Sequence, residues 1–179
     1  MLRIVKIIND NENKKTNELT NRIEVLIYSR QKMEEKLKRE RLEENSAIIS
    51  FYDTPMIDDD PYCVPIAYPS DIVVYYSQND DIAFENLQAR GYTEDSYFMD
   101  CNAMAKFILD CAAKSITKFI CQCEFGQSRS SGAAAAIAEF FNHNGIEIFA
   151  DYRYLPNQVI YNKLIRALAA QNFFNQIGV

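Results

Sequence analysis

Short β-rich runs alternate with longer helix-forming runs along this chain, and the alternation constrains the fold more than any other feature. We expect strands at 23–28, 47–52, 72–76 and 119–121, and helices at 29–44, from Thr93 past Cys111, at 130–142 and at 156–171. The run Ile72-Val73-Val74-Tyr75-Tyr76 is typical of a strand buried on both faces of a parallel sheet. The predicted fold class is therefore α/β, with three α/β/α layers around a small, mostly parallel central sheet.

The domain organisation follows from where apolar residues are scarce. Residues 9–21 carry almost no apolar side chains, so we expect a polar N-terminal arm over 1–21 and one domain over 22–179. Four prolines between 53 and 70 exclude long regular structure there. The helix from Thr93 should carry Glu94 and Asp95 in its first turn, and the last helix should bury Ile160, Leu164 and Leu168.

Composition excludes several classes of partner. A net charge of −6 argues against binding to nucleic acid or to an anionic membrane surface. No apolar run reaches the roughly 18 residues of a membrane span, and the start does not read as a signal peptide, so we expect a cytoplasmic protein. Five cysteines without a C-x-x-C pair, and a single histidine, predict neither a disulfide framework nor a metal or other cofactor.

The turn after the fourth strand has the sequence Cys123-Glu124-Phe125-Gly126-Gln127-Ser128-Arg129-Ser130, a C-x5-R-S pattern. A short loop that leads into a helix N-terminus directs backbone amides at one point, where they would bind a phosphate and stabilise a thiolate. We expect the amides of residues 124–129 to bind phosphate and Gly126 to allow the tight bend. Arg129 offers a planar fork for two phosphate oxygens, and the Ser130 hydroxyl could assist the departure of the sulfur.

A purely structural interpretation treats Cys123 as a buried strand-end thiol and Arg129 as a surface cation. It fits poorly, because a cation at a helix N-terminus opposes the helix dipole unless an anion is nearby. Cys121 is expected to be a core residue that points away from the ligand side. His143 is expected at the surface, as a helix C-cap, with Gly145 ending that helix.

Residues 120–132 resemble the signature loop of the protein tyrosine phosphatase superfamily, most closely that of compact, dual-specificity-like bacterial members. Softer matches are Ser29-Arg30, Asn79-Asp80-Asp81-Ile82 and Pro156-Asn157. The resemblance implies a phosphatase-like fold and phosphomonoester hydrolysis through a phospho-cysteine intermediate, without metal. The family usually has histidine before the nucleophile, where this chain has Gln122.

The resemblance also implies a general acid on a second loop. Asp81 is the preferred candidate, with Asp80 close behind; Asp95 is explained as first-turn charge, and Asp100 should lie inside the same helix. Asn157 either positions the hydrolytic water or caps the last helix. The predicted substrate is a phosphorylated protein or peptide, mainly at phosphotyrosine, with dual specificity left open. The alternatives are a rhodanese-like sulfurtransferase and a phosphate-binding pseudophosphatase.

Overall fold

A computed structural model of the chain describes residues 22–55 and 63–177, so the predicted arm at 1–21 and part of the proline-containing segment lie outside the described residues. Its centre is a parallel sheet of four strands in the order β1-β4-β2-β3. The strands are β1 (Glu24–Ser29), β2 (Ser46–Tyr52), β3 (Val73–Gln78) and β4 (Lys118–Cys123). The α/β fold class is confirmed.

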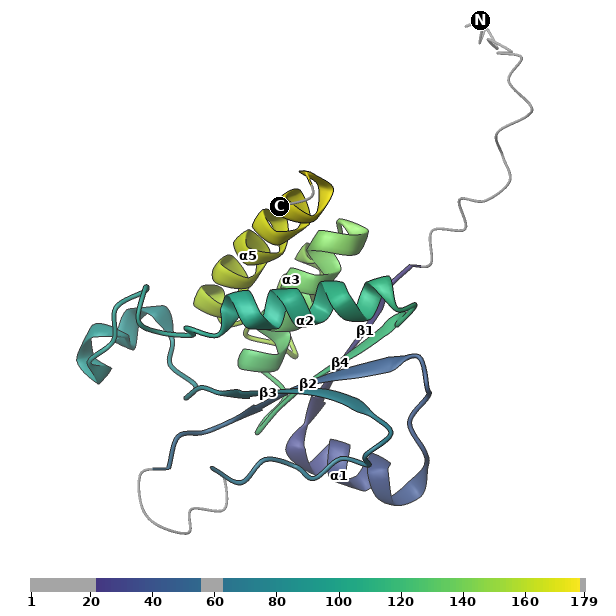
Figure 1. The fold of residues 1–179 in the computed structure, drawn as a ribbon. Helices are drawn as coiled ribbons and strands as arrows, with labels where there is room; N and C mark the ends of the chain where they lie inside the picture. The colour runs from purple at the N-terminus through teal and green to yellow at the C-terminus, as the bar shows by residue number, and fades with distance from the viewer. Residues whose placement is uncertain (1–21, 56–62, 178–179) are drawn as a thin grey trace, which may run out of the picture.

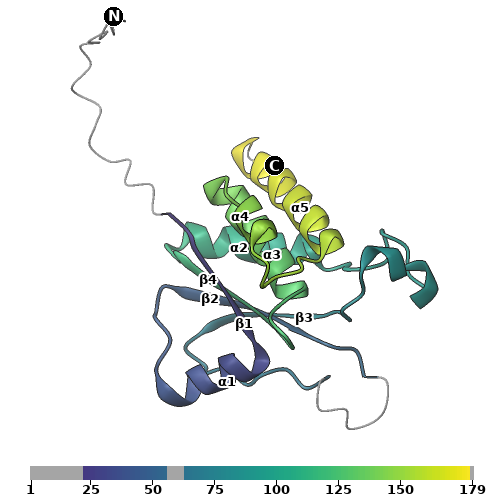
Figure 2. The same cartoon turned by 180° about the vertical axis from the view of Figure 1, so that it is seen from behind.

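Helices cover both faces of this sheet. The α-helices are α1 (Arg30–Arg39), α2 (Cys101–Ala113), α3 (Arg129–Asn142), α4 (Ile146–Ala150) and α5 (Gln158–Ile177), and two short 3-10 helices, η2 (Phe84–Asn86) and η3 (Gln88–Arg90), follow β3. Helix α1 lies on one face, and α2, α3 and α5 lie on the other (Figure 1). Seen from behind, α4 joins this second group (Figure 2). Among the described residues, no helix is both long and apolar enough to cross a bilayer.

Two apolar clusters fill the spaces between the layers. The larger one joins the sheet to α2, α3 and α5 and includes Ile49, Phe119, Ile137, Ile160 and Leu164. The smaller one lies on the α1 side and includes Met33, Leu42, Ile48 and Ile120. Neighbouring residues of β2 and β4 divide between the two clusters, as expected for a strand whose side chains alternate between faces.

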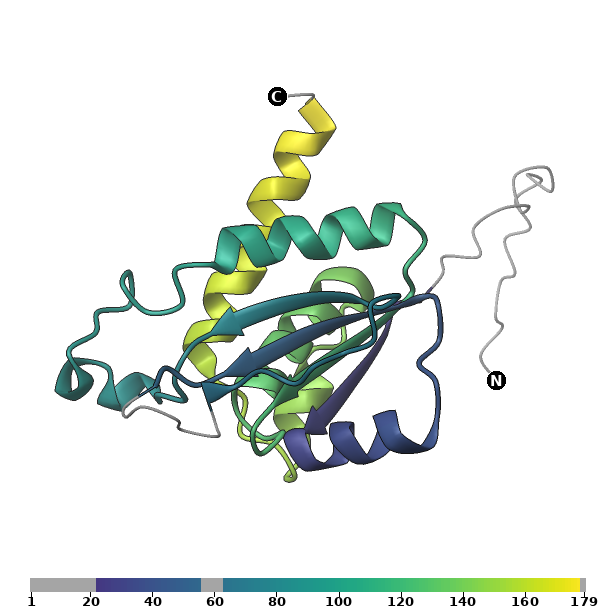
Figure 3. The same ribbon diagram turned by 60° about the horizontal axis from the view of Figure 1, so that its bottom comes forward.

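All four strands run in the same direction, so their carboxyl ends meet along one edge of the sheet (Figure 3). That edge carries the starts of four connections, at Arg30, Asp53, Asn79 and Glu124. Ligands bind at this edge in open parallel sheets. The topology therefore places the C-x5-R-S turn and the segment 79–82 at the same edge of the sheet, with the end of β2 between them.

The sequence predicts that the strand at 72–76 is buried on both faces, and the position of β3 in the sheet differs from this prediction. Among the described strands it pairs only with β2, so it is an edge strand, and Val73 and Tyr76 are 46% and 42% exposed. Its apolar side chains lie on half-buried surfaces instead: Tyr75 packs against Phe107, and Tyr76 lies near Tyr68. A continuous apolar run alone does not reveal how many neighbours a strand has.

Helix α1 begins as predicted and ends early. Ser29 is the N-cap, and its Oγ accepts a hydrogen bond from the Lys32 amide at 3.3 Å. The expected extension to Glu44 is wrong, because Glu40 is already in an extended conformation. Leu42 is buried with Met33. Burying Leu42 in the α1-side cluster outweighs the helix propensity of the charged residues around it.

Helix α2 begins at Cys101, so the prediction of a helix from Thr93 is wrong. Thr93 and Ser96 do exchange cap-like hydrogen bonds, between the Thr93 amide and Ser96 Oγ (2.8 Å) and between the Ser96 amide and Thr93 Oγ1 (3.2 Å). The turn stops because Phe98 has a φ of +55°, which an α-helix cannot contain. Asp100 is consequently the N-cap residue of α2 and does not lie inside the helix.

Helix α3 ends where the sequence predicts, whereas the segments after it depart slightly from expectation. His143 is exposed, has a φ of +58° and is the C-cap of α3, as predicted, so His143 and not Gly145 ends this helix. Gly145 begins α4 instead, packed so closely on α3 that a Cβ would collide with the Ala135 carbonyl. Helix α5 continues beyond the predicted Gln171 to Ile177. Its three predicted core residues, Ile160, Leu164 and Leu168, are fully buried.

Candidate active site

The C-x5-R-S turn is a tight loop between β4 and α3. Cys123 is the last residue of the strand, and Arg129 is the first residue of the helix. Gly126, midway, has a φ of +70°, and a Cβ there would lie 2.6 Å from the backbone nitrogen of Ser29. Only glycine fits this approach between the loop and the end of β1.

The carbonyls of this loop are held from outside. Those of Glu124, Gln127 and Ser128 accept hydrogen bonds from the amides of Arg30 (3.0 Å), Leu155 (2.9 Å) and Asn157 (3.1 Å). The amides of residues 125–128, in contrast, donate to no acceptor in the part of the chain that the structure describes. Backbone amides without an acceptor, in a turn that leads into the N-terminus of a helix, are donors suited to an anion.

The thiol of Cys123 lies inside this loop, beside a hydroxyl. Cys123 and Ser130 are 1% and 0% exposed, and Sγ and Oγ are 3.0 Å apart. A hydroxyl at this distance can donate a hydrogen bond to a thiolate. Ser131, the next residue, instead donates to the carbonyls of Gln127 and Ser128 and so steadies the loop.

Cys121 is the core residue that the sequence predicts, although its orientation differs from the prediction. It is fully buried in the same cluster as Cys123. Residues two apart on a strand share a face, so Cys121 lies deeper on the α3 side and does not point away from it. Burial raises the pKa of the Cys121 thiol far above its ordinary value, and the neighbouring Cys123 adds to the effect.

Arg129 is anchored at one end of its guanidinium group. Nη1 donates to Asp53 Oδ1, in an ion pair, and to the Asn79 carbonyl at 2.5 Å. The side chain is almost fully buried, yet Nε has no hydrogen-bond partner among the described residues. A buried, charged donor without an acceptor is costly, and a phosphate oxygen would satisfy it.

The segment after β3 brings Asp81 to the loop and turns Asp80 away. Asp81 Oδ1 accepts a hydrogen bond from Ser128 Oγ at 2.6 Å. Asp80 Oδ1 accepts one from the Thr54 amide at 2.7 Å, so that carboxylate supports the chain after β2 instead. Of the two candidates, only Asp81 contacts the Cys123 loop.

The other candidates occupy structural positions. Asn157 caps α5, because its Oδ1 accepts hydrogen bonds from the amides of Val159 and Ile160, both at 3.1 Å. Asp95 is exposed on the turn before α2. Gln122 is buried, and its Oε1 accepts a hydrogen bond from Ser50 Oγ at 2.7 Å. As the residue before Cys123 on the strand, Gln122 points to the opposite face of the sheet.

Sequence reasoning missed Asp53 and Tyr97. Asp53 follows β2 directly, at the edge where strand ends meet, and that position is a usable signal. Tyr97 belongs to a segment assigned to a helix, yet its hydroxyl donates to the Asp80 carbonyl at 2.8 Å. Nothing in the local sequence around Tyr97 points to this contact.

Burial and a neighbouring cation have opposite effects on the one acidic side chain of the loop. Glu124 lies beside Cys123, and partial burial raises the pKa of its carboxyl above the ordinary value. Arg30, 4.0 Å away, acts in the opposite direction. Phe125 is 73% exposed at the tip of the loop. Within the described ranges, no group of three or more His, Cys, Asp and Glu side chains is placed to hold a metal ion.

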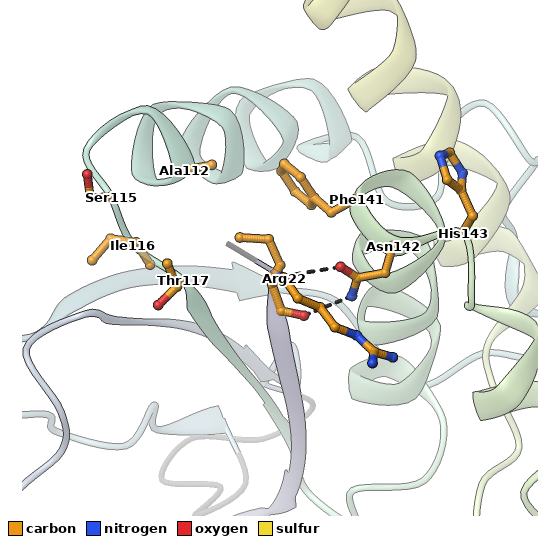
Figure 4. Close-up of a pocket in the computed structure, with 9 residues that line it drawn as sticks. Arg22, Ala112, Ser115, Ile116, Thr117, Phe141, Asn142 and His143 are labelled. Atoms are coloured by element: carbon orange, nitrogen blue, oxygen red, sulfur yellow. Dashed lines mark hydrogen bonds between the residues drawn. The ribbon is translucent and has the colours of Figure 1, made fainter. Parts of the chain in front are cut away.

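A separate cavity of about 740 Å³ lies at the other end of the sheet, between the ends of α2 and α3 and the start of β1 (Figure 4). Arg22, Phe141 and His143 are among its lining residues. Asn142 closes one side, because its Oδ1 and Nδ2 bond the Ile23 amide (3.2 Å) and the Ile23 carbonyl (2.8 Å). The cavity is remote from Cys123, and its one amide side chain is already satisfied by the backbone.

No protein-family model matches the sequence, and no curated protein matches it. Solved structures that resemble the fold include a crystal structure of PTPMT1, with 14% identity and a TM-score of 0.48 over 84% of this chain and 94% of that chain. A crystal structure of PTPMT1 in complex with PI(5)P has 13% identity and a TM-score of 0.48 over 84% of this chain and 93% of that chain.

Proposed function

We propose that this protein hydrolyses phosphomonoesters through a phospho-cysteine intermediate on Cys123, as a compact, dual-specificity-like member of the protein tyrosine phosphatase superfamily. The hydrogen bond between Ser128 and Asp81 carries the proposal. It brings a carboxyl group to the same loop that holds a thiol and a buried guanidinium. Nucleophile, phosphate clamp and acid are the three parts that this reaction needs.

In the first step, the Cys123 thiolate attacks phosphorus and forms the S–P bond while the bond from phosphorus to the ester oxygen breaks. Asp81 gives its proton to that oxygen, so the product leaves as an alcohol or phenol. The loop amides and the Nε edge of Arg129 bind the equatorial oxygens, where charge spreads in the transition state. Asp53 balances the other end of the guanidinium and keeps it in place.

In the second step, water attacks the phospho-cysteine and the S–P bond breaks. The Asp81 carboxylate accepts a proton from the water, which regenerates the acid. Sulfur leaves with the electron pair of the S–P bond, and the Ser130 hydroxyl, 3.0 Å from Sγ, stabilises the thiolate by donating a hydrogen bond. Inorganic phosphate is the product, and the step uses no metal.

Phosphotyrosine on a protein or peptide is the substrate that the surroundings of the loop favour. The positive charge of Arg129 is paired with Asp53, and the loop itself carries Glu124 and no lysine, so the site offers little positive charge for a polyphosphorylated head group. Arg30, a nearby cation, is already bonded to Glu34 and to the Val64 carbonyl. The exposed ring of Phe125 offers an apolar contact for the aromatic ring of the substrate.

Two other activities fit part of the site. A rhodanese-like sulfurtransferase also uses a cysteine on an anion-binding loop, but a leaving-group acid such as Asp81 has no role in sulfur transfer. A pseudophosphatase would bind phosphate without turnover, and the presence of Cys123, Arg129 and Ser130 together argues against it.

The test is an assay with para-nitrophenyl phosphate and a phosphotyrosine peptide, in the presence of EDTA. Wild type should turn over both. Cys123→Ser should lose activity yet bind vanadate, and Arg129→Lys should lose at least about 100-fold in kcat/KM, because a point charge cannot replace the fork. Activity above about 10% of wild type in either variant contradicts the proposed roles of these groups.

Two further measurements separate the alternatives. Cyanide-dependent sulfur transfer from thiosulfate, with no phosphatase activity, would establish the sulfurtransferase. A phosphoinositide turned over faster than the phosphotyrosine peptide would overturn the proposed substrate class while leaving the chemistry intact.

A further inference from the structure

The segment that carries Asp81 accepts hydrogen bonds from two buried side chains, one on each side of that residue. Its flanking carbonyls, at Asp80 and Ile82, accept hydrogen bonds from Tyr97 Oη at 2.8 Å and from Asn157 Nδ2 at 2.9 Å. Tyr97 is 2% exposed and Asn157 is 5% exposed, so both donors act from the protein interior. Two buried side chains thus hold the backbone on either side of the carboxylate that meets the Cys123 loop.

The start of the same segment is held as firmly. The Asn79 carbonyl accepts a hydrogen bond from Arg129 Nη1, and the Asn79 amide donates to the Tyr52 carbonyl at 3.0 Å. Asn79 Nδ2 donates to Ser77 Oγ (2.7 Å) and to Asp100 Oδ1 (3.2 Å). The carbonyls of residues 79, 80 and 82 therefore all accept hydrogen bonds from side chains, and the three donors come from different parts of the chain.

Tyr97 is itself fixed by helix α5. The ammonium group of Lys163 donates to the carbonyls of Glu94 (3.0 Å), Asp95 (3.1 Å) and Tyr97 (2.6 Å). The Tyr97 ring packs edge-on against Tyr92, with centroids 5.8 Å apart. This turn is consequently a rigid support for the Tyr97 hydroxyl.

We infer that Tyr97 and Asn157 are positioning residues that hold Asp81 in place over the Cys123 loop before any substrate binds. The inference rests on the proposed function and deepens it. A loop whose carbonyls are already bonded does not have to close around the substrate, so the acid loses no conformational freedom in the reaction. Tyr97 touches neither substrate nor reacting atoms; it acts through Asp81.

Tyr97→Phe tests the inference, because it keeps the buried ring and removes only the hydroxyl. Tyr92→Phe is the matched control, since Tyr92 touches Tyr97 but donates to no carbonyl of residues 79–82 among the described residues. Asn157→Ser is a second variant, because serine still caps α5 but cannot reach the Ile82 carbonyl in the same way. All variants are first compared in melting temperature.

For Tyr97→Phe we expect kcat for a phosphotyrosine peptide to fall roughly two- to tenfold, the rate equivalent of one buried hydrogen bond. An activated aryl phosphate, which needs little help from an acid, should be hydrolysed at nearly the wild-type rate. In an Asp81→Asn background, Tyr97→Phe should have no further effect, because two residues that act through one group are not additive. An equal loss on both substrates, or an undiminished loss in the Asp81→Asn background, would overturn the inference.

Amide hydrogen exchange gives a readout that does not depend on turnover. Residues 79–83 should exchange faster in Tyr97→Phe and in Asn157→Ser than in wild type, and at the wild-type rate in Tyr92→Phe. Unchanged exchange in both variants would show that the hydroxyl and the amide do not hold the segment. Faster exchange in a protein without phosphatase activity would uphold the support of the loop and refute the proposed function alone.

Discussion

Ser128 Oγ and Asp81 Oδ1 are 2.6 Å apart, and this contact joins the loop after β4 to the segment after β3. The two residues are 47 positions apart in the chain. Because the strands are parallel, their carboxyl ends bring the two loops to one edge of the sheet. Substitutions of the groups that meet at this edge should have distinct, measurable effects.

Asp81→Asn should slow hydrolysis of a phosphotyrosine peptide by roughly 10²–10⁴, the usual contribution of a positioned acid. A tyrosine phenolate, with a pKa of about 10, leaves poorly without a proton, whereas an activated phenolate leaves largely unaided. The loss should therefore be much smaller for para-nitrophenyl phosphate, as steady-state rates on both substrates would show. Asp80→Asn, whose carboxylate bonds the Thr54 amide, is the control and should show no such dependence on the leaving group.

Asp53→Asn should weaken both stability and catalysis. The change leaves the buried Arg129 guanidinium without its countercharge, at an expected cost of about 1–3 kcal/mol in the free energy of unfolding. The freed guanidinium also loses its orientation, so kcat/KM should fall. Urea denaturation and steady-state kinetics measure the two effects. Asp110→Asn breaks the exposed pair with Lys106 and should cost no more than about 0.5 kcal/mol; an equal loss in both variants would refute the role of Asp53.

Gly126→Ala should disrupt the loop for two reasons, a positive φ and a steric collision. The new Cβ would lie 2.6 Å from the Ser29 nitrogen, which belongs to the backbone and cannot rotate away. Gly91→Ala separates the two effects, because Gly91 also has a positive φ, +80°, but no atom lies within 4 Å of the point that a Cβ would occupy there. We expect about 1 kcal/mol for Gly91→Ala and a clearly larger loss for Gly126→Ala, together with loss of vanadate binding. Similar losses in thermal melts would show that the contact with Ser29 relaxes easily.

Glu124→Gln should stabilise the protein at neutral pH. The folded state raises the pKa of this carboxyl above its ordinary value of 4.5, chiefly through burial, so it holds the proton more tightly than the unfolded chain does. The protonated Glu124 carboxyl therefore makes its full contribution to the stability of the folded state below pH 4.5. This contribution is lost as the pH rises through the pKa that the carboxyl has in the folded state.

The melting temperature of Glu124→Gln should accordingly exceed that of wild type at about pH 7, and the difference should close as the pH approaches the ordinary carboxyl pKa of about 4. Glu85→Gln, which removes an exposed carboxylate after β3, is the control and should lack this trend. A Glu124→Gln variant that is less stable at neutral pH would show that the attraction of Arg30 outweighs burial.

Local patterns in the chain were enough to predict most elements and the chemistry of the central loop. Strand and helix periodicity, the Ser29 cap and the C-x5-R-S turn can each be recognised within a few residues. They place Cys123 just after a strand and Arg129 just before a helix, and in the structure Cys123 ends β4 and Arg129 begins α3. Local patterns sufficed because the backbone conformation of a turn depends mainly on its own residues.

The remaining features depend on contacts between distant parts of the chain, which no local pattern encodes. Asp80 and Asp81 are adjacent and chemically identical, and only the packing of their segment against Tyr97 and Asn157 directs one of them to Ser128. The ion pair of Asp53 with Arg129 spans 76 positions, and the edge position of β3 depends on the order of all four strands. Helix α2 starts late because Tyr97 and Phe98 gain more from burial than from a helical turn.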